Sequence, residues 1–133
     1  MIILKSEREI EAMAKAGKLL AACHRRLAKM IRPGITTMQI DKYVDAFLKK
    51  NGAKSEQYGY KGYQFATCAS INDEICHGFP REIPLKKGDL VTIDMVVNLN
   101  GALADSAWTY AVGEVSDAAR KLMDVTKKSL YIG

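Results

Sequence analysis

Residues 91–110 read VTIDMVVNLNGALADSAWTY, and this stretch decides the predicted fold. The Asn-Gly pair at its centre is the strongest short signal for a β-hairpin, because both residues accept the positive φ angles of a two-residue turn. β-Branched and apolar residues on either side of the pair favour strands. Counting outward from the turn places Val96 opposite Asp105. The predicted strands are 89–99 and 102–112.

The two aspartates of this hairpin are predicted to share one face of the sheet. Asp94 lies two residues from Val96, and side chains alternate between the faces with a period of two. Asp94 and Asp105 are then diagonal neighbours, with Cα atoms roughly 7–8 Å apart. Paired carboxylates in so apolar a strand are costly without a compensating charge, and residues 91–112 contain no Lys or Arg. A bound divalent cation would supply that charge. The alternative is that both carboxylates are simply solvated.

The remaining pattern predicts an α+β protein. Two helices precede the hairpin, each begun by a capping-box pattern, at Ser6 with Glu9 and at Thr36 with Gln39. A strand is predicted over FATCASI, and Ser116 is placed to cap a last helix. Helices followed by strands and then another helix indicate α+β, here a single domain covering residues 1–133. The predicted helices before the hairpin are 7–31 and about 36–50.

Composition places the chain among ordinary globular proteins. Its 133 residues are 48% hydrophobic and 26% charged, and no apolar run approaches the ~20 residues that cross a membrane. The start of the chain becomes charged too soon for a signal peptide, and three cysteines favour reduced thiols, so a cytoplasmic location is predicted. The net charge of +5 is spread over helices and lysine pairs. No nucleic-acid-binding motif is present, so solvated surfaces explain this charge better than a specific nucleic-acid partner.

Further residues with possible chemistry lie between the helices and the hairpin. His77, in NDEICHGFP, is a candidate hydrogen-bond donor or metal ligand, and the alternative is a loop histidine without a role. Tyr60, Tyr63 and Cys68 could line a small apolar pocket or belong to the ordinary core. His24, on the first helix, is predicted to lie at the surface or at its boundary.

Three segments together resemble the type I methionine aminopeptidases. They are LKSEREIEAMAKAG with IRPGITTMQID, then GYKGYQFATCASINDEICHGFP, then KKGDLVTIDMVVNLNGALADSAWTYAVG. The resemblance implies one half of a pita-bread fold, an antiparallel sheet with helices on one face. It also implies that the chain is a truncated N-terminal half, without the one histidine ligand and the two glutamate ligands that complete the metal site of the whole enzyme.

The resemblance assigns a function and a role to each site residue. The implied activity is metal-dependent removal of the N-terminal methionine from nascent polypeptides. Asp94 and Asp105 match ligands of two divalent metal ions, which could be Co, Mn, Fe or Zn. His77 matches a catalytic histidine that hydrogen-bonds the substrate. Tyr60, Tyr63 and Cys68 match positions that bind the methionine side chain.

Other partners and functions are also open. The ribosome is a further candidate partner, and the isolated half is expected to be inactive and to self-associate. Phe79 and Ala104 depart mildly from the family pattern. A non-catalytic binding module on the same fold, or another peptidase such as a prolidase-like enzyme, are the alternative functions.

Overall fold

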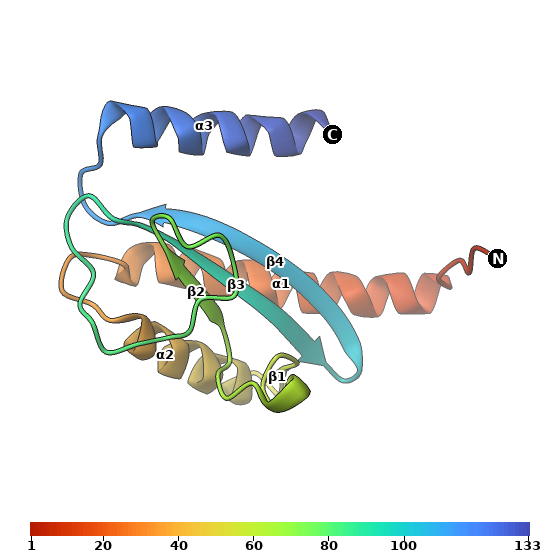
Figure 1. The fold of residues 1–133 in the computed structure, drawn as a ribbon. Helices are drawn as coiled ribbons and strands as arrows, with labels where there is room; N and C mark the ends of the chain where they lie inside the picture. The colour runs from red at the N-terminus through yellow and green to blue at the C-terminus, as the bar shows by residue number, and fades with distance from the viewer.

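A computed structural model describes all 133 residues of the chain. Three α-helices and four strands form one antiparallel sheet with helices beside it (Figure 1). β3 is the central strand, because β4 pairs along one edge while β1 and β2 share the other. The elements are α1 (Glu7–Met30), α2 (Thr37–Lys50), β1 (Lys54–Ser55), a 3-10 turn (Tyr60–Gly62), β2 (Cys68–Ile71), β3 (Leu90–Leu99), β4 (Ala102–Ala111) and α3 (Asp117–Ile132).

The hairpin has the predicted turn and register. Asn100 and Gly101 have φ angles of 54° and 88°, the left-handed conformations that the two-residue turn needs. Val96 pairs with Asp105, as counting from the turn predicted. The register is stable because a slip of one residue would turn the buried side chains of β3 out to water.

Both predicted capping boxes form. The Ser6 side chain accepts a hydrogen bond from the Glu9 backbone, and the Glu9 carboxylate accepts one from the Ser6 backbone at 2.7 Å. Thr36 and Gln39 make the same exchange at the start of α2. These contacts satisfy backbone donors that a helix N-terminus otherwise leaves without partners.

The core lies between one face of the sheet and the helices α1 and α2. Alternate residues of β3 are fully buried there, while the residues between them are only half-buried. Burial of a large aliphatic side chain contributes about 1.5–3 kcal/mol, so this layer supplies most of the stability of the sheet. The buried residues are Val91, Ile93, Met95 and Val97 on β3, with Leu20, Leu27, Ile40, Val44 and Leu48 on the helices.

A polar network also joins α1 to β4. His24 is half-buried, and its Nδ1 lies 2.7 Å from the Tyr110 hydroxyl while its Nε2 lies 3.1 Å from Ser106 Oγ. The Tyr110 hydroxyl also donates to the His24 carbonyl at 3.1 Å. His24 is therefore the boundary residue that the sequence predicted, with a structural role.

α3 stands apart from the other two helices. It forms after Ser116, as predicted, but none of its residues is buried. Figure 1 shows it across the hairpin from α1 and α2, separated from the strands. The ammonium of Lys127 lies 5.4 Å from the centre of the Trp108 ring, which connects α3 to β4. Its exposed apolar residues are Leu122, Val125, Leu130, Tyr131 and Ile132.

The sequence did not predict the short elements between α2 and β2. β1 pairs with β3 through only two residues, too few for a period of two to be recognised. The strand predicted over 65–71 begins only at Cys68. The residue before it, Thr67, donates its amide to the buried carboxylate of Asp41 and not to a neighbouring strand.

A candidate metal centre on the open face of the sheet

The face of the sheet opposite α1 and α2 carries the acidic pair. We call it the open face. Asp94 pairs with Ala107, and Asp105 pairs with Val96, so the two aspartates are diagonal neighbours on this face. The geometric prediction of a shared face is confirmed. The strand register alone brings the two aspartates together, because side chains alternate between the faces and both aspartates point to the half-exposed face of the hairpin.

The pKa of Asp94 responds to its neighbours on this face. Burial raises the pKa of Asp94, and the charge of Asp105 and a hydrogen bond with it raise this pKa further. The positive charge of His77 acts in the opposite direction. Neither aspartate forms an ion pair with Lys or Arg, since all five ion pairs of the chain lie elsewhere. The pair therefore has no Lys or Arg partner to compensate its charge.

This donor set fits a divalent metal ion only in part. Two adjacent carboxylates without a cationic partner supply hard oxygen ligands and negative charge. No group of three or more His, Cys, Asp or Glu side chains in the chain could hold a metal ion. Asp94 and Asp105 are thus two candidate ligand side chains, and a tight site needs others.

His77 reaches this region from the segment that follows β2. The Ala69 amide donates to the Gly78 carbonyl at 2.8 Å, and the Gly78 amide donates to Ser70 Oγ at 3.1 Å. His77 is exposed and has a φ of 55°, an uncommon left-handed conformation for a residue with a side chain. Such strained backbone is concentrated at functional sites.

Gly78 makes the close approach of this segment possible. A Cβ atom at this position would lie 2.4 Å from the Ala69 carbonyl oxygen, a distance that real side chains do not reach. Glycine is therefore required for the contact that holds His77 beside the sheet. The motif HGFP therefore places the sterically required Gly78 directly after His77, the candidate reactive side chain.

Glu74 and Arg81 brace the same segment. One oxygen of Glu74 accepts from the Ile71 amide at 2.8 Å, and the other accepts from Arg81 at 2.6 Å. The Ile71 hydrogen bond is the main cause that lowers the pKa of Glu74, and Arg81 adds to it. The brace fixes the loop on both sides of His77.

Aromatic rings lie beside the acidic pair. Tyr63, Phe65 and Phe79 form a triangle in which ring centres are 5.5–5.9 Å apart, the spacing of favourable aromatic pairs. Cys68 pairs with Asp94 across the sheet and is only 5% exposed. Burial raises the pKa of the Cys68 thiol, which suits a neutral, apolar lining. This cluster gives the open face an apolar patch next to its charged one.

The structure does not group Tyr60 with these residues. Its ring is 66% exposed, and it lines a separate surface hollow with Lys49 and Glu56. The ammonium of Lys61 lies 5.5 Å from its centre. The predicted role of Tyr60 in substrate binding stays a prediction.

Two further residues shape the site without a signal in the sequence. Gln57 donates to Cys68 Sγ at 3.3 Å and accepts from the Val96 amide at 3.3 Å, which links the loop before β2 to the strand of Asp94. Asp41 accepts both the amide and the hydroxyl of Thr67 at 2.8 Å. Both act across long sequence separations, so no local motif reveals them.

Comparison with known proteins supports the predicted resemblance. The model of metallopeptidase family M24 matches residues 11–133. The chain is 46% identical over 133 residues to methionine aminopeptidase 1 of Bacillus subtilis. The alignment covers all of this chain and 54% of that protein. It is 44% identical to methionine aminopeptidase of Clostridium perfringens, again over 100% of this chain and 53% of that protein.

Solved structures show the same relationship. Methionine aminopeptidase from Rickettsia prowazekii superposes with a TM-score of 0.95 and 34% identity, over 98% of this chain and 53% of that one. Aminopeptidase P from E. coli gives a TM-score of 0.83 at 26% identity, over 96% of this chain and 28% of that one. The shared architecture is the predicted pita-bread fold.

The extent of these matches is as informative as their strength. The chain spans about half the length of the methionine aminopeptidases it matches. No helix of the chain combines the length and the apolar character needed to cross a bilayer. With nearly all of its residues matched by one family model, the chain belongs to metallopeptidase family M24.

Proposed function

We propose that the protein containing this chain removes the N-terminal methionine from polypeptides by metal-dependent hydrolysis. The observation that carries the proposal is the uncompensated pair Asp94 and Asp105 on the open face. Its context is a chain 46% identical to a methionine aminopeptidase.

Asp94 and Asp105 are the residues of this chain that would hold metal. When bound, divalent metals polarise a carbonyl group and lower the pKa of a water molecule, which is the chemistry that peptide hydrolysis needs. Register places both carboxylates on one rigid hairpin, so their mutual orientation is fixed before metal arrives. Two ions of Co, Mn, Fe or Zn remain the proposed complement.

His77 is proposed as a catalytic histidine that hydrogen-bonds the substrate beside the metals. It is exposed, held by a strained backbone, and close enough to lower the pKa of Asp94. Tyr63 and Cys68, with Phe79, would receive the methionine side chain, because sulfur packs favourably against aromatic rings. Tyr60 would need to move toward them to take part.

The wider context of the proposal follows from its substrate. Nascent polypeptides emerge at the ribosome in the cytoplasm, so we propose the ribosome as a partner and the cytoplasm as the location. We also propose that residues 1–133 fold as one domain. Alone, this domain would be inactive and would self-associate through exposed apolar side chains of α3, such as Leu130 and Ile132.

Peptide hydrolysis tests the proposal directly. The protein is incubated with Mn(II) or Co(II) and a Met-Ala-Ser peptide, and released methionine is measured. In the active protein, Asp94→Asn or Asp105→Asn should lower activity by more than the about 10- to 100-fold typical of residues that only orient a ligand. Asp124→Asn on α3, where Asp124 is exposed, is the matched control and should keep full activity. Full activity in Asp94→Asn would disprove the proposed metal role.

His77→Ala separates substrate positioning from metal binding. We expect turnover to fall by about 10²–10⁴-fold, the usual contribution of a positioned proton-transfer group. Metal content, measured by elemental analysis after dialysis, should remain that of the unaltered protein. Loss of metal in His77→Ala would instead make this residue a ligand.

A second peptidase function has a specific observation in its favour. Aminopeptidase P and a Xaa-Pro dipeptidase from Bacillus anthracis share this fold at 26% identity. Comparing Met-Ala-Ser with Ala-Pro-Ala peptides distinguishes the two specificities. No hydrolysis of either peptide by the metal-loaded protein would favour the non-catalytic binding module.

A further inference from the structure

The positive charge of the chain is concentrated in one segment. From Ala12 to Ile40 there is no Asp or Glu, while six Lys and Arg occur there. The other 14 Lys and Arg are balanced by all 15 Asp and Glu of the chain. Residues 12–40 therefore carry a charge of +6, and the rest of the chain carries −1.

The structure gathers these residues on one face of α1. At 100° per residue, five of them fall within an arc of about 100°, centred roughly opposite the residues that α1 buries in the core. All five are exposed. We call this set the basic stripe: Lys15, Lys18, Arg25, Arg26 and Lys29.

No carboxylate neutralises the basic stripe. The five ion pairs of the chain involve none of its members. Only Arg26 has a specific neighbour, the half-buried Phe47 ring 5.4 Å away. An ordinary solvated helix mixes both signs, as α2 does with its Lys49–Asp45 pair at 2.7 Å. The stripe departs from that arrangement from Lys18 to Lys29, and the nearest acid on its side of the helix is Glu11, one turn before Lys15.

We propose that the basic stripe is a docking surface for the phosphate backbone of double-stranded nucleic acid. From Lys15 to Lys29 it runs about 21 Å, at 1.5 Å per residue. Duplex nucleic acid presents phosphates continuously over such a length, and arginine forks match phosphate oxygens. The absence of a neutralising acid is then useful, because each carboxylate would repel the backbone.

The composition of the stripe favours a duplex over other polyanions. Single strands are bound by stacking bases on exposed aromatic rings, and the stripe offers none. A helix that lies on a membrane inserts its apolar face, whereas α1 buries Leu20 and Leu27 in the core of the protein. Contacts to phosphates alone carry no sequence information, so binding is expected to be independent of sequence.

The position of the stripe leaves the peptidase site accessible. α1 covers the core face of the sheet, while Asp94 and Asp105 lie on the opposite, open face. A duplex on the outer side of α1 would not cover the acidic pair. The inference stands independently of the proposed peptidase activity.

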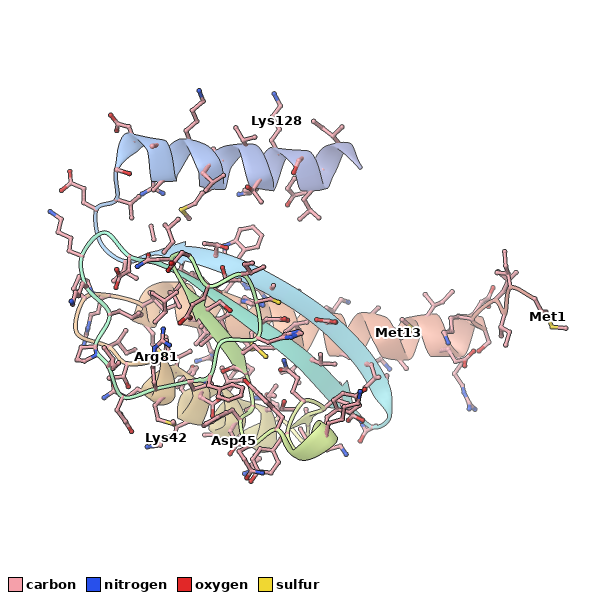
Figure 2. The ribbon with its side chains drawn as sticks, viewed as in Figure 1. Met1, Met13, Lys42, Asp45, Arg81 and Lys128 are labelled. Carbon is pink, nitrogen blue, oxygen red and sulfur yellow. The ribbon has the colours of Figure 1, made fainter.

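Fluorescence anisotropy tests the proposal with labelled 20-base-pair RNA and DNA duplexes of unrelated sequence. Binding should be similar for different sequences, and for five phosphate contacts log K should fall with log salt at a slope of about −4.5. The test variant is Arg25→Glu with Lys29→Glu. The control is Lys121→Glu with Lys128→Glu on α3, which changes the net charge equally; Lys128 points away from the molecule (Figure 2).

We expect the stripe variant to lose at least about 10-fold in affinity at 100 mM salt and the control less than about 3-fold. Circular dichroism should show the same fold and melting temperature for both, since all four residues are exposed. Equal losses in the two variants would reduce the effect to net charge and overturn the proposal. So would undetectable duplex binding at 50 mM salt, or tighter, stripe-dependent binding to phosphatidylserine vesicles.

Discussion

The two faces of β3 differ more than any two separate elements of the molecule. Ile93 is fully buried against the helices, and its neighbour Asp94 lies on the open face with a carboxylate that forms no ion pair with Lys or Arg. One strand thus carries stability on one side and candidate chemistry on the other. Because side chains alternate, evolution can change either face with little direct contact to the other.

The buried face should show the largest effect on folding. Ile93→Ala removes a fully buried side chain and is expected to cost about 2–5 kcal/mol of unfolding free energy. Val96→Ala on the open face, where the side chain is only half-buried, should cost about 1 kcal/mol. Urea denaturation followed by circular dichroism measures both values. Equal losses would mean that the two faces do not divide their roles in this way.

The next effect concerns the segment that brings His77 to the open face. Gly78→Ala places a Cβ atom 2.4 Å from the Ala69 carbonyl oxygen, and such overpacking typically costs about 1–3 kcal/mol. We expect the segment to shift and the histidine resonance to move in an NMR spectrum. Urea denaturation gives the accompanying loss of stability.

A second glycine provides a control of opposite sign. Gly17 lies within α1, and an added Cβ atom would meet nothing within 4 Å. Gly17→Ala should therefore stabilise the protein by about 0.8–1 kcal/mol through helix propensity. If both substitutions changed the stability in the same direction, the close contact at Gly78 would not be what makes an added Cβ atom unfavourable there.

Acid should loosen the segment that carries His77 before it affects the hydrophobic core. Hydrogen bonds lower the pKa of Glu74, chiefly from the Ile71 amide, and that of Asp89, chiefly from the Lys86 amide. A lowered native pKa gives stability that is present above the ordinary carboxyl value and is lost as pH falls through the native one. The melting temperature should fall by a few degrees between pH 5 and pH 3.

Glu74→Gln isolates that acid dependence. The amide keeps one acceptor for the Ile71 amide but has no charge to lose, so the variant should melt lower at pH 7 and change less between pH 5 and pH 3. Glu114→Gln removes an exposed surface pair with Lys87 and serves as the control. An unchanged pH profile in Glu74→Gln would exclude this brace as the acid-sensitive contact.

Local patterns predicted what local physics determines. The Asn-Gly turn fixed the register that brings Asp94 to Asp105, and both helix starts followed from side chains within one turn. The roles given to these aspartates and to His77 came from the resemblance and await the experiments above. The family itself is confirmed by the match over residues 11–133.

Long-range contacts explain what the sequence could not supply. Gln57 joins Cys68 to β3 through side-chain hydrogen bonds that no spacing rule anticipates. The basic stripe was also hidden, because composition suggested charge spread over several surfaces. Only helix geometry and the absence of ion pairs show that the charge is gathered on one side of α1.

The smallest predicted effect is the cost of the acidic pair itself. Burial raises the pKa of Asp94 in the folded protein, and the Asp105 charge adds to the shift. A raised native pKa gives stability that is present below the ordinary Asp value and is lost as pH rises through the native one. At pH 7 the metal-free pair therefore opposes folding, and Asp94→Asn should stabilise the protein by up to about 1 kcal/mol, the size of a cross-strand charge effect. Urea denaturation in EDTA at pH 7 measures this gain, which should shrink as the pH falls and the Asp94 carboxyl takes up a proton. A metal-free Asp94→Asn variant less stable than the unaltered protein at pH 7 would show that another group already compensates the pair, and the division between a stabilising and a functional face of β3 would then not hold at Asp94.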